Sequence, residues 1–526
     1  MNLRHASLPF ILAVTWAASP LQAEIKLPKV FTTHMVLQRD MAVPIYGTAS
    51  PDEKVTVAFR NQTKTAVAGK DGKWSVKLDP LKAGGPDTLT IGDKKIEDVL
   101  VGDVWVGSGQ SNMDMVVTNY SANDPVLAKN AEATYPKLRL LKKGAGDVWQ
   151  EATPANNPGF SALLFSFGVP LQKELDVPVG LMVGAVGGTP SGYWLSEDMY
   201  RADAACAEAA KKFAATYNYD EAMAKYQEAK AKYDADLAAY KPVEAAAKAE
   251  GKTPPPAPRP PQLPGKAGET NGAKIGNLFE AFVRPYVGYG IKGVLWDQGE
   301  SGTALTGVPQ YEVMGALIKG WRNAWGQGEF PFLYVQKPSG GGCAWDYTDP
   351  MSDKGDKFAP LPKTIPNPPN PSYSQPYFAT FMQYPKTYMV TSTDLGSGIH
   401  PTNKSGYGAR AAKVAMSTVY GAKAEFCGPI YASHTVDGNK VRVKFTHVGK
   451  GLAFKNGDQL QGFMIAGADK KFVWADAVID GQTVVVSSKD VEKPEAVRYA
   501  WSGSFPWANL FNEDHLPATP FRTDSW

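Results

Sequence analysis

Two side chains in this sequence have the types that nucleophilic catalysis needs, a serine hydroxyl and a histidine imidazole. Ser111 lies in the turn Gly-Ser-Gly-Gln-Ser-Asn-Met at residues 107–113, where small residues let the chain leave a strand sharply. His400 lies in Gly-Ile-His-Pro at residues 398–401. An imidazole has a suitable pKa to take the serine proton as a general base. The pair predicts acyl transfer, with Ser111 as nucleophile and His400 as base.

Elimination supports His400 as the base. The chain has six histidines, and His400 is the only one in the region predicted below to be α/β. His5 falls in an N-terminal leader. The other four fall in the β-rich flanks: His34, His434, His447 and His515.

Two further motifs offer hydrogen-bond donors for a tetrahedral intermediate. Val-Gly-Gly-Thr-Pro at residues 186–190 contains Gly187 and Gly188, whose backbone N–H groups can approach a ligand closely. Trp-Asp-Gln-Gly-Glu-Ser at residues 296–301 places the neutral amide of Gln298 at a strand end. These donors are candidates for an oxyanion hole, although each motif is also compatible with plain loop structure.

All four motifs follow short apolar runs, the pattern of strands that helices bury on both faces. The runs lie at residues 101–106, 179–183, 293–296, 332–335 and 388–393. Open parallel sheets place their ligands at the carboxyl ends of their strands. Residues 99–427 therefore predict an α/β domain with a mainly parallel sheet, and the motifs are expected to gather at one edge of it.

Segments rich in β-structure flank this domain. Residues 24–98 alternate apolar and polar side chains, as at residues 55–59, and predict an N-terminal β-domain. Residues 428–526 return to alternation, with Asp-Gly turns at 437–438 and 480–481, and predict a C-terminal β-domain. Both are expected to resemble β-sandwiches.

An insertion at residues 201–268 interrupts the α/β domain. Apolar side chains recur there at helical spacing in an Ala-, Lys- and Glu-rich background, namely Met223, Tyr226, Tyr233, Leu237 and Tyr240. Seven prolines between residues 254 and 264 favour an extended polyproline segment. We interpret the insertion as a helical hairpin that packs on the catalytic domain by its aromatic stripe. The alternative is an arm that binds a partner.

Residues 1–23 have the pattern of a secretory signal. A cationic start precedes a short apolar run at residues 6–18, and Ala23 supplies a small residue before the expected cut. The run is shorter than the roughly 20 residues of a membrane-spanning helix. We expect a secreted or periplasmic protein with no membrane span after cleavage.

Charge and cysteine content exclude other classes. Lys and Arg number 55 against 52 Asp and Glu, a net charge of +3, without a like-charge block suited to nucleic acid. Cys206, Cys343 and Cys427 form no C-x-x-C pair, which argues against a cysteine zinc site. At most one disulfide can form. Neither a nucleic-acid partner nor a metal is expected.

The motifs resemble those of the sialate O-acetylesterase family of SGNH-type hydrolases. The matching segments are residues 109–113, 187–189, 296–301 and 399–401, and the resemblance spans nearly the whole mature chain apart from the insertion. It implies a flavodoxin-like three-layer sandwich, flanked by the two β-domains, and no metal or organic cofactor. It also implies a set of site residues: Ser111 as nucleophile, His400 as base, and the Ser111 N–H, a Gly187 or Gly188 N–H and the Gln298 side chain as oxyanion donors.

The third member of the triad is open. Many SGNH hydrolases carry Asp three residues before the histidine, where this chain has Ser397. Asp394, six residues before His400 at a strand end, is the favoured group to orient the imidazole. A backbone carbonyl near Ser397 and the carboxylate of Glu300 are the alternatives.

We therefore expect a serine esterase that hydrolyses O-acetyl esters on carbohydrates, with O-acetylated sialic acids as the first candidate substrates. An acetyl esterase acting on plant or algal polysaccharide is the alternative among enzymes. A non-catalytic carbohydrate-binding protein is the alternative of another class, because two β-domains and 13 tryptophans offer surfaces for sugar stacking. The coincidence of Ser111, Gln298 and His400 at strand ends favours the esterase.

Overall fold

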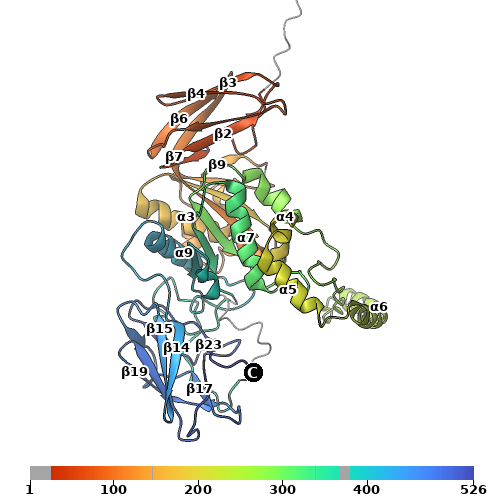
Figure 1. Cartoon of the computed structure of the whole chain (residues 1–526), viewed down its shortest axis with the longest axis vertical. Coiled ribbons are helices and arrows are strands. Elements are labelled where there is room, and N and C mark those ends of the chain that lie inside the picture. The colour runs from red at the N-terminus through yellow and green to blue at the C-terminus, as the bar shows by residue number, and fades with distance from the viewer. Residues whose placement is uncertain (1–24, 145, 338, 367–378) are drawn as a thin grey trace, which may run out of the picture.

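The computed structural model describes residues 25–144, 146–337, 339–366 and 379–526 (Figure 1). The expected signal segment, residues 1–23, lies outside the described residues. A β-rich region, an α/β region and a second β-rich region follow one another along the long axis of the molecule (Figure 1). Within the described ranges, no helix has both the length and the apolar character that crossing a membrane requires.

Alternating side chains build the N-terminal β-region. Its strands are β1 (Val36–Gln38), β2 (Val43–Thr48), β3 (Lys54–Phe59), β4 (Gln62–Val67), β5 (Lys73–Leu78), β6 (Gly84–Ile91) and β7 (Lys94–Gly109). In β3 and β5 every second residue is buried, as the apolar-polar alternation predicts. β2 pairs with β5, whereas β3 pairs with β4 and β6.

β7 joins the first two regions in one continuous strand. Up to residue 102 it pairs with β6 and β1, and from residue 103 it pairs in parallel with β10 (Val179–Ala185) and then β11 (Gly293–Asp297). The expected domain boundary between residues 98 and 99 therefore falls inside a strand. The N-terminal region is joined to the sheet of the α/β region by strand pairing rather than by a linker.

The sheet of the α/β region has the strand order β13-β12-β11-β7-β10-β8-β9. Its remaining strands are β8 (Tyr135–Lys142), β9 (Trp149–Ala152), β12 (Phe332–Val335) and β13 (Thr387–Val390). Only β9 is antiparallel to its neighbour. Numbered along the chain, the six parallel strands β7, β8, β10, β11, β12 and β13 lie side by side in the order 2-3-1-4-5-6. The order reverses at β7, so the loops after β10 and β11 flank the end of β7.

Helices cover both faces of this sheet. Val104 and Val106 of β7 belong to the core that includes α7 (Gln310–Trp325). Trp105, between them, belongs to the core that includes α3 (Ala162–Leu175) and α9 (Lys404–Thr418). Successive residues of a strand point to opposite faces, so one apolar run serves both layers. The shorter helices are α1 (Ser111–Asp114), α2 (Pro125–Ala131) and α4 (Glu197–Arg201).

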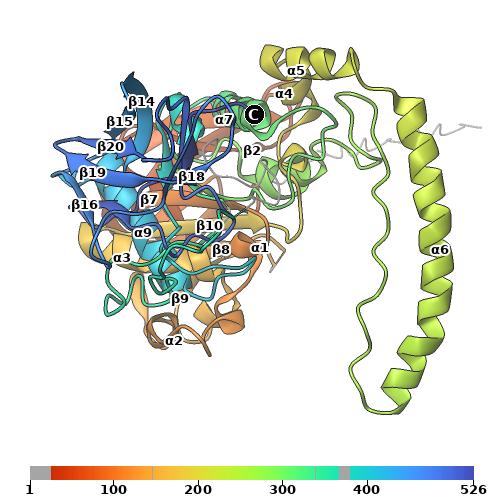
Figure 2. The same cartoon turned by 90° about the horizontal axis from the view of Figure 1, so that it is seen from below.

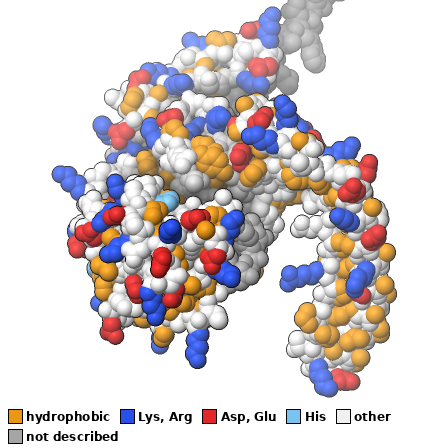
Figure 3. Space-filling model, turned by 60° about the horizontal axis from the view of Figure 1, so that its bottom comes forward, with side chains coloured by type: hydrophobic (Ala, Val, Ile, Leu, Met, Phe, Trp, Pro, Cys, Tyr) orange, Lys and Arg blue, Asp and Glu red, His pale blue; other side chains and the backbone are white. Residues whose placement is uncertain are grey.

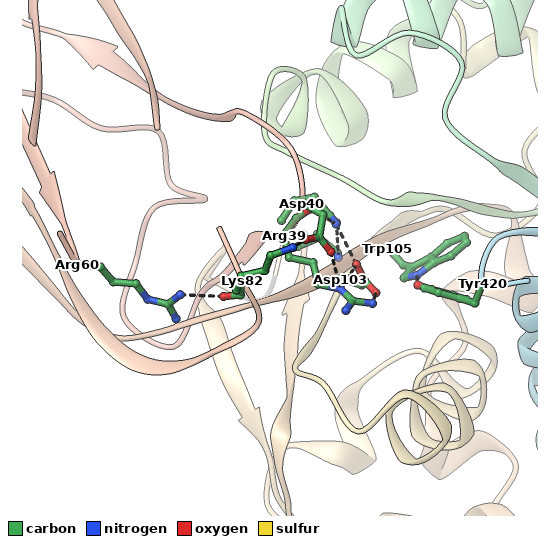
Figure 4. A network of polar contacts seen from close by, with 9 residues as sticks. Arg39, Asp40, Arg60, Lys82, Asp103, Trp105 and Tyr420 are labelled. Carbon is green, nitrogen blue, oxygen red and sulfur yellow. Dashed lines mark hydrogen bonds and ion pairs between the residues drawn. The ribbon is translucent and has the colours of Figure 1, made fainter. Parts of the chain in front are cut away.

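An ion pair with a buried carboxylate also links the N-terminal region to the sheet of the α/β region. Arg39 donates from Nε and Nη2 to the two carboxylate oxygens of Asp103 in β7, at 3.0 and 2.8 Å (Figure 4). The Asp103 side chain is fully buried. Two residues farther along β7, Trp105 donates from Nε1 to the hydroxyl of Tyr420 at 3.2 Å (Figure 4).

The insertion does not pack as expected. It contains α5 (Ala204–Ala214) and the 31-residue α6 (Tyr219–Ala249). In α6 no residue is buried. α6 stands away from the body, and the segment after it runs back along it (Figure 2). Tyr240 of α6 donates its hydroxyl to the carbonyl of Pro255 at 2.9 Å. The prediction that the aromatic stripe packs on the catalytic domain is therefore wrong for α6.

The composition of α6 explains how it forms without tertiary cover. Lys230 and Lys232 each pair with an aspartate four residues later, and Lys248 pairs with Glu244. Such i,i+4 pairs stabilise exposed helices. Figure 3 shows hydrophobic side chains spread along this arm among the charged ones.

The C-terminal region is built from small antiparallel sheets around a core of its own. Its strands are β14 (Ile430–Asp437), β15 (Lys440–Thr446), β16 (Leu452–Phe454), β17 (Phe463–Ala466), β18 (Val473–Trp474), β19 (Asp476–Asp480), β20 (Thr483–Ser487), β21 (Ala496–Tyr499), β22 (Leu510–Asn512) and β23 (Phe521–Arg522). The two predicted Asp-Gly turns close the hairpins β14-β15 and β19-β20. The three cysteines are free and buried.

Candidate active site

Ser111 and His400 meet at the carboxyl edge of the sheet. Ser111 begins α1 directly after β7, and His400 lies in the loop between β13 and α9. His400 Nε2 and Ser111 Oγ are 2.8 Å apart. In the tautomer that carries its proton on Nδ1, the imidazole accepts a hydrogen bond from the serine hydroxyl at Nε2. This is the arrangement from which a histidine can take the proton of a serine.

The turn that presents Ser111 depends on Gly109. Its φ is 133°, and a Cβ at this position would stand 2.1 Å from the carbonyl oxygen of Asp297. Only glycine is compatible with both conditions. The close approach lets the N–H of Gln110 donate to the same carbonyl at 2.9 Å. The ends of β7 and β11 are thereby held together where the chain turns into Ser111.

Gly187 and Gly188 lie beside Ser111. A Cβ on Gly187 would stand 3.4 Å from the Cβ of Ser111. The N–H of Gly187 donates to Asp114 Oδ2 at 3.3 Å. Gly188 has a φ of 72° and open space around its Cα, and among the described residues its N–H has no hydrogen-bond partner. The structure thus brings both predicted glycines to the site.

Gln298 follows β11 as predicted, but its amide is engaged elsewhere. Its Nε2 donates to the carbonyl of Gly302 at 2.9 Å and to that of Thr189 at 3.4 Å. Its Oε1 accepts from Gln310 at 3.0 Å. Because an amide nitrogen has two protons, these contacts leave none for an oxyanion. This geometry differs from the expected donor role: Gln298 ties together the loops after β10 and β11.

A group of charged side chains lies next to the turn that contains Ser111. Lys337 contacts the carboxylates of Asp297 at 2.6 Å and Glu300 at 2.8 Å. Glu300 also accepts from Gln110 Nε2 at 2.5 Å and from Asn112 Nδ2 at 3.3 Å. Burial acts to lower the pKa of Lys337, but the two carboxylates outweigh it and hold this pKa above its usual range. Through Glu300 these charges hold Gln110 and Asn112, the residues on either side of Ser111.

Lys404, at the start of α9, is a second buried lysine near the site. Its Nζ donates to Asn112 Oδ1 at 2.6 Å and lies 4.6 Å from the centre of the Tyr120 ring. Burial lowers the pKa of Lys404 to about 7, partly offset by the charge of Asp297. Lys337 carries a like charge and acts in the same direction as burial.

This lowered pKa predicts how stability depends on pH. In the unfolded chain Lys404 stays protonated up to about pH 10.4, whereas the folded protein releases this proton near pH 7. Since the unfolded state then binds more protons, raising the pH from about 7 to 9 stabilises the fold, by about 1.4 kcal/mol per pH unit. The measurement is the free energy of unfolding of wild type minus that of Lys404→Met, which should rise over this range. Lys225→Met, at an exposed position of α6, should give a flat difference; a flat difference for Lys404→Met would contradict the prediction.

The structure does not bring Asp394 to His400. Both carboxylate oxygens of Asp394 accept from the guanidinium of Arg410 in α9, at 3.2 and 2.8 Å. The two side chains are 2% and 5% exposed. Glu300, the other carboxylate considered, is held by Lys337, as described above. Among the described residues, Ser111 is the one hydrogen-bond partner of the His400 ring. These placements differ from the expected triad, because each carboxylate faces a buried cation that it neutralises.

One group of side chains away from the site has the types of metal ligands. Within the described residues, His34, Asp98 and Glu151 offer atoms within 4.8 Å of one another. Arg139 already contacts Asp98 at 2.9 Å and Glu151 at 3.5 Å. A guanidinium thus supplies the positive charge there.

Sequence reasoning missed Asn112, Lys337 and Lys404, which the structure places around the nucleophile. Asn112 lies inside the quoted serine motif, and its position next to Ser111 was the available signal. Lys337 and Lys404 gave no signal in the sequence, because lysine is normally exposed and no local pattern marks a buried one. All three are nearly fully buried.

Comparisons with known proteins agree with the motifs. Sialate O-acetylesterase of Rattus norvegicus is 26% identical, over 98% of this chain and 98% of that protein. Sialate O-acetylesterase of Homo sapiens is 25% identical, over 98% and 95%. A solved structure of a carbohydrate acetylesterase from Xanthomonas citri matches with a TM-score of 0.70 and 28% identity, covering 96% of this chain and 100% of that one. No family model matches. The resemblance to sialate O-acetylesterases is thus confirmed over nearly the full chain.

Proposed function

We propose that this chain is a serine esterase that removes acetyl groups from carbohydrate. The observation that carries the proposal is the 2.8 Å contact between His400 Nε2 and Ser111 Oγ, at the carboxyl edge of a parallel sheet. The relatives support it, since they are named as sialate O-acetylesterases and as a carbohydrate acetylesterase.

The mechanism follows from this pair. His400 takes the Ser111 proton while Oγ attacks the acetyl carbonyl carbon, and the carbonyl oxygen becomes negatively charged. The N–H groups of Ser111, at the start of a helix, and of Gly188 are the proposed oxyanion donors, with Gly187 packed beside them. Collapse of the intermediate breaks the bond to the sugar oxygen, which takes the proton from His400 and leaves as a hydroxyl. Water then attacks the acetyl-serine while His400 takes its proton; as the acyl bond to Oγ breaks, acetate leaves and Ser111 regains the proton from His400.

The architecture supports the finer fold assignment. The order β10-β7-β11-β12-β13 of five parallel strands, with helices on both faces, supports a flavodoxin-like SGNH domain for residues 99–427, to which β8 adds a further parallel strand beside β10. We assign the β-rich segments 24–98 and 428–526 as flanking domains. Export to the periplasm or the medium is part of the same proposal, and it rests on residues 1–23.

We take O-acetylated sialic acids as the first candidate substrates, on the names of the relatives. Acetylated plant or algal polysaccharide is the second candidate, and the structure from Xanthomonas citri, a carbohydrate acetylesterase, is compatible with either. The test is acetate release by the purified protein from acetylated sialic acids, xylan and other acetylated glycans, read by an enzyme-coupled acetate assay. Release from at least one of them is expected. Binding without release from any of them would leave the non-catalytic carbohydrate-binding alternative.

A further inference from the structure

The position of His400 poses a problem that the catalytic pair alone does not solve. In triads a buried carboxylate holds the imidazole in its orientation. Here Asp394 and Glu300 are both engaged with buried cations. The imidazole itself is exposed. Its geometry must therefore be set by the backbone that carries it.

That backbone has few attachments. Its two ends are fixed: the carbonyl of Gly396 accepts from Tyr407 at 3.0 Å, and Pro401 is buried. Between them, Gly398 has a φ of 100° and open space around its Cα. Within the described residues, only two hydrogen bonds reach residues 397–400. One is the contact of His400 with Ser111, and the other is donated by Asn112 Nδ2 to the carbonyl of Ile399, at 2.9 Å.

The Asn112 amide has a single orientation that its surroundings can satisfy. Its Oδ1 faces Lys404 Nζ at 2.6 Å, and the lysine amino group has an N–H to donate in both of its protonation states. Its Nδ2 faces Glu300 Oε1 at 3.3 Å and the Ile399 carbonyl at 2.9 Å, both of which only accept. The side chain is 1% exposed, so water does not compete for these bonds. The buried charges thus aim the Asn112 N–H at the peptide bond that leads into His400.

We propose that Asn112 is a positioning residue for the esterase reaction: its side chain, held by Lys404 and Glu300, clamps the Ile399–His400 peptide so that the imidazole faces the adjacent Ser111. The inference rests on the proposed function, because the pair it aligns is the proposed catalytic pair. The same turn thus carries Ser111 and the side chain that positions His400. The distance between Ser111 and His400 is then fixed without a carboxylate hydrogen-bonded to the imidazole.

The test is Asn112→Asp in the full-length protein. The substitution keeps the side-chain size and the acceptor for Lys404, but the carboxylate cannot donate to the Ile399 carbonyl. We expect kcat for 4-nitrophenyl acetate to fall by about 10²-fold, the scale of a small misplacement of catalytic groups, with KM changed by less than about threefold. Histidine ring signals in the NMR spectrum report on the imidazole directly: the His400 signal should shift or broaden, because its backbone is no longer held, whereas the His34 signal should stay unchanged. Asn119→Asp is the matched control: it adds the same charge at an exposed position and retains the acceptor for Val116 N–H, so kcat and the His400 ring signal should stay at wild-type values.

Several results would overturn the clamp. These are a kcat for Asn112→Asp within about threefold of wild type, a rise in KM that accounts for the whole loss, or an unchanged His400 ring signal. Should Asn112→Asp fail to fold, Asn112→Ala, which places no charge beside Glu300, is judged by the same measurements. The NMR readout does not depend on ester hydrolysis. Failure of wild type to hydrolyse any acetyl ester would therefore overturn the proposed function and remain distinct from failure of the clamp.

Discussion

Ser111→Ala lowers kcat for acetyl-ester hydrolysis by at least about 10⁴-fold, the expected result if the hydroxyl is the nucleophile. The substitution removes the atom that forms the acyl intermediate and leaves His400 without its partner. Stability should change little, because one hydrogen bond is worth about 1 kcal/mol and this one is made to an exposed imidazole. The measurements are kcat on a simple acetyl ester and the melting temperature.

Ser108→Ala is the matched control for the loss of a hydroxyl in the same turn. Ser108 is fully buried in β7, and its Oγ donates to the carbonyl of Gly184 at 2.7 Å. Its removal should lower stability by about 1 to 3 kcal/mol, since the buried carbonyl loses its partner, without a kinetic loss of several orders of magnitude. Retention of more than about a tenth of wild-type kcat by Ser111→Ala would reject the nucleophile.

The sequence allowed the Ser111–His400 pair to be predicted although 289 positions separate the two residues. The reason is local. Short apolar runs mark buried parallel strands, and the residues after such runs share one edge of the sheet. The run at residues 332–335 coincides with β12, and the run at residues 293–296 falls within β11. The presence of a single histidine in the α/β region then left one choice of base.

The pairing of buried charges could not be predicted from the sequence. Arg410 is one of 55 Lys and Arg residues, and it faces Asp394 only because α9 packs against the end of the sheet. The burial of Lys337 and Lys404 likewise results from tertiary packing and has no local pattern. The stripe of apolar residues along α6 was expected to pack on the catalytic domain. In the structure these residues are only half-buried, and Tyr240 contacts Pro255 in the Pro-rich segment of the same insertion.

The Asp394–Arg410 pair gives the second large effect, on stability rather than on catalysis. Asp394→Asn leaves the guanidinium of Arg410 buried without a counter-charge, and its Nε has no hydrogen-bond partner among the described residues. Breaking a buried pair from one side costs about 3 to 5 kcal/mol, so the free energy of unfolding should fall by that amount. Chemical denaturation measures it. At temperatures where the variant is folded, kcat should stay within about tenfold of wild type, equivalent to 1.4 kcal/mol in the barrier.

Asp103→Asn separates this structural role from a role in the triad. Asp103 is fully buried and forms a bidentate pair with Arg39, which is 20% exposed. Asp103 lies six residues before the end of β7, about 20 Å from the edge that carries Ser111. Asp103→Asn should lose less stability than Asp394→Asn, because water and Asp40 still reach the Arg39 guanidinium, and it should have no kinetic effect. If both variants lose stability and both keep kcat, Asp394 supports the packing of α9. If Asp394→Asn alone lowers kcat by about 10² or more while folded, Asp394 acts on His400, as a triad aspartate does. The Asp394–Arg410 contacts favour the first result, because both oxygens of Asp394 face the buried guanidinium and, among the described residues, the His400 ring makes its hydrogen bond with Ser111 instead.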